Sequence, residues 1–197
     1  MPEAQRKIIP ADLLSIPEYD QQRKTLKQNL IPMKKLRRIE VGPFATFYFE
    51  NYATMWLQVQ EMLRIEKGGE EQIAGELAAY NPLIPQGDEL IATMMIEIED
   101  ERVRRHTLAT LGHIEEMVSL RFVGQKVTAK PTDDLERTTE EGKTSSVHFL
   151  HFTFDAAQKT AFKKSDSEVI AGIAHPKYGH MAVLPDEMRA SLAADFS

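Results

Sequence analysis

The sequence contains no cysteine among its 197 residues. This absence excludes disulfide bonds, zinc–thiolate sites, cysteine-ligated iron–sulfur clusters and catalytic thiols. Any catalysis or metal binding must therefore use histidine, aspartate, glutamate, tyrosine, lysine or serine side chains.

Long apolar runs are also missing. No segment approaches the roughly 20 consecutive apolar residues that a membrane-spanning helix needs. The N-terminal stretch MPEAQRKIIPADLL has no apolar core of signal-peptide length and is interrupted by prolines. We therefore expect a cytoplasmic protein with no membrane partner.

Common motifs for phosphate binding and hydrolysis do not occur. The sequence has no GxGxxG, GxxxxGK[ST], HExxH or GxSxG. The helix expected at residues 51–67 also lacks the Glu-x-x-His pair of di-iron bundles, because Glu61 is followed three residues later by Arg64. That spacing instead predicts a salt bridge within the helix.

Charge is unevenly distributed in a chain whose net charge is −6. Residues 21–40 contain seven bases and one acid, whereas residues 61–101 contain eleven acids and two bases. A nucleic-acid partner is not expected, because no aromatic residues interleave the basic run and the total charge is acidic. The alternative is that the two segments meet within the fold or in a homodimer, and we expect a homo-oligomer.

Hydrophobic periodicity and capping residues predict a mixture of helices and strands without a regular βαβ rhythm. This mixture indicates a single-domain α+β fold over residues 1–197, with a largely antiparallel mixed sheet packed with helices on one side. We expect an N-terminal tail at 1–12 and an exposed loop at 130–146. The predicted helices cover about 19–29, 51–67, 70–79, 100–111, 155–164 and 185 onward; the predicted strands lie within 38–50, 90–98, 117–129, 147–154, 168–175 and 181–184. Ser15 is expected to cap the first helix, Asp155 is expected to form a capping box with Gln158, and Gly124-Gln125 is expected to form the turn of a hairpin.

Two histidines occur in the strand-like stretch KTSSVHFLHFTF at 143–154. Side chains alternate along a strand, so His148 and His151 point to opposite faces and cannot chelate one metal. Downstream, His175 and His180 bracket a short turn. If these two converge with His148, the three imidazoles suit zinc or non-haem iron with an open coordination position. Alternatively, His175 and His180 hydrogen-bond the backbone in a tight loop.

A second candidate site is a polar pocket beside the helix expected at 51–67. Asn51, Thr54, Gln58 and Glu61 form a row next to its apolar face, which predicts either a ligand-facing stripe or a solvated flank. The candidate pocket residues are Glu50, Asn51, Gln58, Glu61, Tyr80, Asn81, His148 and Tyr178.

The runs VGPFATFYFEN, QVQEMLRIE, YNPLIP, IATMMIEI, KTSSVHFLHF and HPKYGH occur in this order. They resemble the uncharacterised bacterial family called domain of unknown function 3501, from about Leu13 to Ala193. The family pattern includes ten polar residues of this chain: Glu50, Asn51, Gln60, Glu61, Tyr80, Asn81, Ser146, His148, His175 and His180.

This resemblance implies no established activity. It implies that the genes of the family often neighbour those of a rubrerythrin-type protein and an iron–sulfur oxidoreductase. An accessory or binding protein in peroxide defence or electron transfer is therefore the favoured hypothesis, with such a redox protein as partner. The alternative is a small metal-dependent or acid–base enzyme that uses His148 with His175 and His180.

Overall fold

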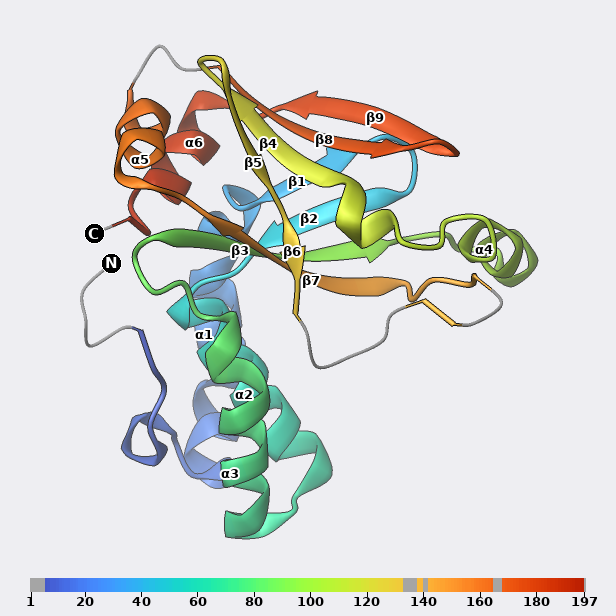
Figure 1. The fold of residues 1–197 in the computed structure, drawn as a ribbon. Helices are drawn as coiled ribbons and strands as arrows, with labels where there is room; N and C mark the ends of the chain where they lie inside the picture. The colour runs from blue at the N-terminus through green and yellow to red at the C-terminus, as the bar shows by residue number, and fades with distance from the viewer. Residues whose placement is uncertain (1–5, 133–137, 140–141, 165–167, 197) are drawn as a thin grey trace.

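The computed structural model describes residues 6–132, 138–139, 142–164 and 168–196. Within these residues the strands form two sheets, and every paired neighbour is antiparallel. The first sheet has the order β1-β2-β3-β7-β6, with bounds β1 Arg38–Val41, β2 Ala45–Phe49, β3 Glu89–Ile96, β7 Val147–Thr153 and β6 Lys130–Pro131. The second has the order β5-β4-β8-β9, with bounds β5 Gln125–Thr128, β4 Val118–Phe122, β8 Val169–His175 and β9 Tyr178–Val183 (Figure 1).

The main core lies between the two sheets. Alternate residues of each strand face it, so that Leu90 pairs with Phe152 and Met94 pairs with His148 on the inner face of the first sheet. Two short helices, α5 Ala156–Lys163 and α6 Asp186–Ala193, close one end of the core. Four phenylalanine rings pack together there, with Phe122 stacked on Phe154 and the other contacts edge to face: Phe122, Phe154, Phe162 and Phe196.

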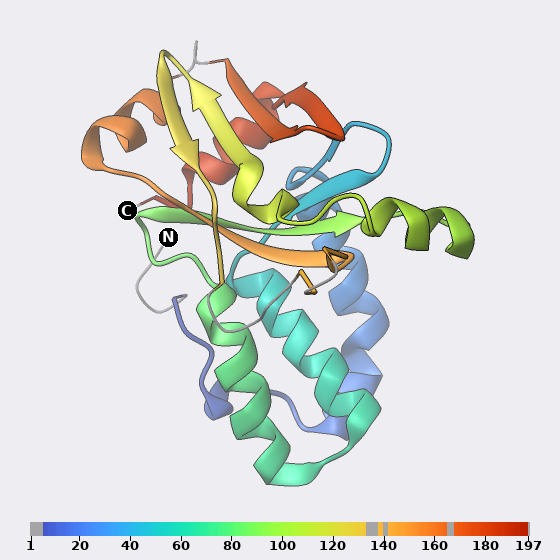
Figure 2. The same cartoon turned by 45° about the vertical axis from the view of Figure 1, so that its right-hand side comes forward.

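Three helices project from the outer side of the first sheet, as both views show (Figures 1 and 2). They are α1 Ile16–Lys35, α2 Tyr52–Glu66 and α3 Gly69–Tyr80. Their apolar faces form a second cluster in which Met55, Val59 and Leu63 of α2 pack against Ile91 of β3. The remaining helical elements are α4 Glu101–Leu108, η2 Pro10–Asp12, η3 Asn81–Leu83 and η4 Ile114–Met117.

The predicted α+β fold is confirmed, with two differences. The strands divide into two sheets where one was expected, because β4, β8 and β9 bury their inner residues against the first sheet and do not extend it. The first hairpin of the second sheet turns at Val123-Gly124 and not at the predicted Gly124-Gln125, since Phe122 pairs with Gln125.

Both expected irregular segments, 1–12 and 130–146, include residues that the structure describes. Residues 6–12 include Ile8, which is fully buried, and its N–H and C=O both bond the side chain of Asn81. The 130–146 segment lies partly outside the described residues, but Thr144 within it is 2% exposed. Among the residues described, no helix is long and apolar enough to cross a membrane.

Candidate functional site

A cleft of about 300 Å³ opens where the outer face of the first sheet meets the end of α1 and the start of α2. Its volume is at the lower end of the range typical of small-molecule pockets. It combines a buried carboxyl group with an exposed lysine, a phenol, an amide and apolar walls. The lining residues are Lys34, Arg37, Tyr48, Phe49, Glu50, Thr54, Met55, Gln58 and Met95.

Glu50 follows β2 and precedes α2, and it lies at the base of this cleft. Its backbone N–H donates to the carbonyl of Ile91 on β3 at 2.8 Å. Its backbone carbonyl accepts from Nη2 of Arg37 at 3.0 Å. These two bonds hold the residue between the sheet and the helix, so the carboxyl group has little freedom to leave the cleft.

The Glu50 carboxyl group is unusual in its environment. The residue is 9% exposed, and Oε1 accepts a 2.7 Å hydrogen bond from Oγ1 of Thr93. Burial raises the pKa of Glu50, while hydrogen bonds from Thr54 and Thr93 and the charges of Lys34 and Arg37 oppose that rise. A carboxyl group with a raised pKa in a cleft is a candidate for ligand binding or proton transfer.

Arg37 supports the floor of the cleft. Its guanidinium group is 3% exposed, donates to the carbonyls of Phe49 and Glu50, and forms a buried ion pair with Asp195. Burial raises the pKa of Asp195, and Arg37 opposes this rise. Arg37 therefore helps to position Glu50. Its guanidinium nitrogens are already bonded within the protein, so they are not expected to bind a ligand.

The rim of the cleft is polar and its walls are apolar. Lys34 is exposed and makes no salt bridge within the described part of the chain. Gln58 is exposed at the other side, and its Nε2 lies 3.5 Å from the hydroxyl of Tyr80. Met55 and Met95 supply thioether walls, which adapt readily to different ligand shapes.

The structure brings some of the predicted pocket residues together. Glu50 and Gln58 line the same cleft, and Tyr80 contacts Gln58 beside it. Asn51 caps α2 through a reciprocal pair of bonds with Thr54, so it shapes the cleft edge and does not line it. Asn81 holds Ile8, as described above.

Glu61 lies further along α2 and ties that helix to α1. It accepts bonds from Tyr19, Arg23 and Lys27, all on α1. Arg64 does not pair with Glu61, as was predicted, but with Asp20. The prediction was wrong because it considered a single helix, whereas α1 lies close enough to take both partners. For these residues the basic and acidic segments meet within the fold.

Tyr178 is a structural anchor of the β1–β2 turn. Its hydroxyl accepts from the N–H groups of Phe44 and Ala45, both at 2.8 Å, and donates to the carbonyl of Val41 at 2.9 Å. The turn approaches so closely that a Cβ on Gly42 would lie 2.5 Å from the His180 ring. His180 packs against the ring of Tyr178, with 4.5 Å between the centroids.

The structure places His148 and His175 in different surroundings. His148 is 0% exposed, its Nε2 lies 2.9 Å from the carbonyl of Ser145, and its Nδ1 lies 3.6 Å from Glu115. His175 accepts from the N–H of Lys177 through Nδ1, and its Nε2 lies 3.2 Å from the carbonyl of Gly112.

The predicted three-histidine centre is therefore not assembled. Among the described residues, which include His148, His175 and His180, no group of three or more His, Asp or Glu side chains is placed to hold a metal ion. His175 instead follows the alternative interpretation, because both ring nitrogens face backbone groups. The burial of His148 also keeps it away from any dissolved substrate.

Lys34 and Thr93 were not predicted as site residues. Thr93 carried a usable signal, since it is the one polar side chain in the apolar run LIATMMI and a buried hydroxyl needs a hydrogen-bond partner. Lys34 was included only in the basic run, and nothing local distinguishes it from its neighbour Lys35. Its position over the cleft depends on where α1 ends relative to the sheet.

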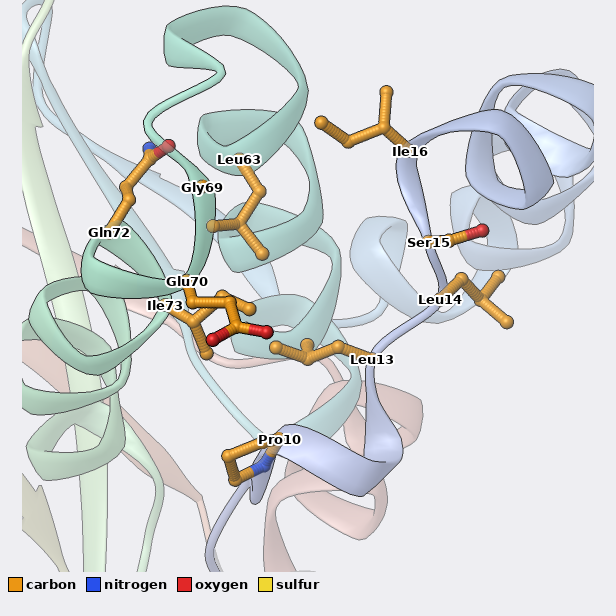
Figure 3. Close-up of a pocket in the computed structure, with 10 residues that line it drawn as sticks. All are labelled: Pro10, Leu13, Leu14, Ser15, Ile16, Leu63, Gly69, Glu70, Gln72 and Ile73. Carbon is orange, nitrogen blue, oxygen red and sulfur yellow. The ribbon is translucent and has the colours of Figure 1, made fainter.

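A second cavity of about 280 Å³ lies between the N-terminal segment and the junction of α2 with α3 (Figure 3). Leu13, Leu63 and Ile73 point into it, and Glu70 extends toward Leu13. Glu70 is the one titratable residue that lines it, and this residue is exposed. The cavity lacks a buried polar group such as Glu50, so the Glu50 cleft is the stronger candidate site.

Comparison with known proteins adds a family and a solved relative. A family model described as "Protein of unknown function (DUF3501)" matches residues 7–196. A novel protein of unknown function from Burkholderia pseudomallei K96243, solved as a crystal structure, is 38% identical, with 97% of this chain and 100% of that chain covered and a TM-score of 0.90. No curated protein matches. The chain belongs to the DUF3501 family, as the sequence resemblance predicted.

Proposed function

We propose that the protein binds a small organic molecule in the Glu50 cleft. The observation that carries this proposal is a carboxyl group, 9% exposed, at the base of a cavity of about 300 Å³. Burial of a carboxyl group is unfavourable unless partners or function compensate for it. A structural role alone would favour closing the cleft over this group with apolar side chains.

The lining suggests the chemical class of the ligand. Lys34 at the rim offers a positive charge to an anionic group, and Glu50 at the base offers an acceptor to an N–H or O–H donor. A cavity of this volume holds roughly ten non-hydrogen atoms if each takes on the order of 30 Å³, the share of a water molecule. Small amino acids and α-hydroxy acids have both groups at this size.

Thermal unfolding in the presence of candidate compounds tests the proposal. Wild-type protein is screened against single amino acids, glycolate and lactate at millimolar concentration. We expect at least one compound to raise the melting temperature, because a ligand that binds only the folded state stabilises it. The shift should disappear in Glu50→Gln and in Lys34→Met.

Lys35→Met is the matched control. Lys35 is also exposed at the end of α1, but it does not line the cleft. This variant should retain the full ligand-induced shift. The proposal fails if no compound of this class shifts the wild type, or if the shift persists in both cleft variants.

The proposed setting is accessory: a ligand-binding cytoplasmic protein that assists a rubrerythrin-type or iron–sulfur partner. This part rests on the family resemblance and not on the geometry of the cleft. Co-purification with the products of the neighbouring genes at physiological salt is the appropriate measurement. If neither product is enriched, the accessory role fails while ligand binding in the cleft is judged separately.

A further inference from the structure

Three polar side chains form a hydrogen-bonded chain on the first sheet. Oγ1 of Thr132 lies 3.2 Å from Nε2 of His151, and Nδ1 of the same ring lies 3.0 Å from Oε2 of Glu89. Glu89 begins β3, His151 lies on β7, and Thr132 directly follows β6. We call these three residues the Thr132 cluster. None of the three lines the Glu50 cleft, so the cluster is a separate site and does not depend on the function proposed above.

Strand pairing places the three side chains on one face of the sheet. Lys130 pairs directly with His151, and Thr132, two residues further on, lies on the same side of the chain. On the other side of β7, Ile91 pairs directly with His151, and Glu89 lies two residues before Ile91. This is the outer face, because Ile91 packs there against α2. Three separate parts of the chain therefore meet at this point.

The partners of the His151 ring define which nitrogen carries its proton. A carboxylate only accepts hydrogen bonds, so Nδ1 donates to Glu89. The lone pair of the neutral ring is then on Nε2, which accepts from the hydroxyl of Thr132. This is the order of groups in a nucleophile–base–carboxylate triad, in which the ring takes the hydroxyl proton and the carboxylate orients the ring.

The Thr132 cluster is open to solvent. The side chains of His151 and Glu89 are 23% and 15% exposed, and Thr132 is half-buried. His148 also contacts a threonine and a glutamate, but it is fully buried. A dissolved substrate can therefore reach the Thr132 hydroxyl, whereas it cannot reach the His148 ring.

Lys130 adds a positive charge beside the cluster. It is exposed, and it forms no ion pair within the residues that the structure describes. Directly opposed residues of an antiparallel pair have Cβ atoms about 5 Å apart, so the long side chain of Lys130 can reach the space beside the Thr132 hydroxyl. A positive group at that place stabilises the oxyanion that forms when a hydroxyl attacks an ester.

We propose that the Thr132 cluster cleaves small carboxylic esters by acyl transfer through Thr132. The hydroxyl gives its proton to Nε2 of His151 as Oγ1 bonds to the carbonyl carbon. The proton passes from Nε2 to the leaving oxygen as the ester C–O bond breaks, which leaves an acyl ester on Thr132. A water molecule then gives a proton to Nε2 and attacks this ester, and the proton returns to Oγ1 as the carboxylic acid leaves.

The steady-state release of p-nitrophenol from p-nitrophenyl acetate by the full chain tests the proposal. His151→Gln should lower the rate by at least about 100-fold, the low end of what a positioned general base contributes. Thr132→Val should lower it as far, because the two residues act as one unit. Glu89 is a positioning residue, so Glu89→Gln should lower kcat without changing KM, and Glu89→Asp should restore part of the loss.

Acid quenching followed by peptide mass spectrometry detects the intermediate. One acetyl group should appear on Thr132 of the wild type and be absent from Thr132→Val. Two exposed residues provide matched controls: Thr153, which pairs directly with Glu89, and His113, which lies 3.1 Å from Glu116. Thr153→Val and His113→Ala should both retain the wild-type rate.

Melting temperatures distinguish catalysis from a structural role. If Thr132 and His151 only hold β6 against β7, their variants melt earlier and keep the wild-type rate, which would overturn the proposal. Acetylation that spares Thr132, or a control variant as slow as Thr132→Val, would also overturn it. If a cluster variant does not fold, the exposed change Lys130→Met decides. A loss of about tenfold supports the proposal, since a flexible cation contributes less than a rigid oxyanion donor, and an unchanged rate refutes it.

Discussion

Replacing Glu61 with glutamine should destabilise the protein in a pH-dependent way. Glu61 accepts from the hydroxyl of Tyr19 at 2.6 Å and from two nitrogens of Arg23 at 2.7 and 2.8 Å. Lys27 approaches the same carboxylate at 3.4 Å. The bond from Arg23 is the largest cause that lowers the pKa of Glu61, from 4.5 to about 2. This carboxylate joins α1 to α2, so its charge should matter for stability.

The sign and size of the effect follow from linkage. A carboxyl group whose pKa is lower in the folded state stabilises the protein above pH 4.5, and this contribution is lost as the pH falls toward 2. Lowering the pKa of Glu61 from 4.5 to about 2 corresponds to an upper bound of about 3 kcal/mol of stabilisation. The Arg23 side chain is 35% exposed, so solvent screening reduces this value. We expect Glu61→Gln to lower the free energy of unfolding by about 2 kcal/mol at neutral pH.

Urea denaturation followed by the fluorescence of Trp56 measures this difference. Trp56 is the sole tryptophan, lies on α2, and packs edge-on against Tyr19 with 6.3 Å between the ring centroids. The gap between wild type and Glu61→Gln should shrink steadily from pH 5 to pH 3. Glu71→Gln, an exposed change on α3, is the control and should show little effect at any pH. A gap of the same size at pH 7 and pH 3 would refute the assignment of the stabilisation to the Glu61 charge.

Two further changes test the hairpins. Val123→Asn should raise the free energy of unfolding by about 1 kcal/mol, because Val123 has a φ of 45° that a β-branched residue adopts at a cost and asparagine tolerates. A melting temperature that does not rise would contradict this. Tyr178→Phe should cost about 2 kcal/mol, since the N–H groups of Phe44 and Ala45 lose their acceptor. An unchanged urea midpoint would show that water replaces the hydroxyl.

The elements with strong local signals were predicted well. The helix expected at 51–67 is α2 at Tyr52–Glu66, and the continuous apolar run expected at 90–98 is β3 at Glu89–Ile96. Ser15 and Asp155 cap their helices through reciprocal bonds, as residue type and spacing predicted. In each case the periodicity or the cap is contained within one element, so no knowledge of the neighbouring elements is required.

Features that depend on neighbouring elements were not predicted. The first helix was predicted over about 19–29, whereas α1 runs from Ile16 to Lys35 and includes Pro32. The hairpin turn shifted by one residue because the register of β4 with β5 placed Val123, and not Gln125, in the turn. The contact between Thr93 and Glu50 joins residues 43 positions apart, and no spacing rule connects them. In each case contacts with other elements outweigh the conformational preference of the local sequence.

Hydrogen-bond partners distinguish the structural polar residues of this chain from the candidate functional ones. Asn81, Tyr178 and His175 each bond the backbone of another segment, and their contacts explain why a polar residue stands there. Glu50 differs because its carboxyl group is buried, partly paired with Thr93, and still faces a cavity. A structural role accounts for the bond but not for the open space beside it. A polar residue in the sequence looks the same in both groups, whereas the cavity beside the Glu50 carboxyl group leaves space for a ligand.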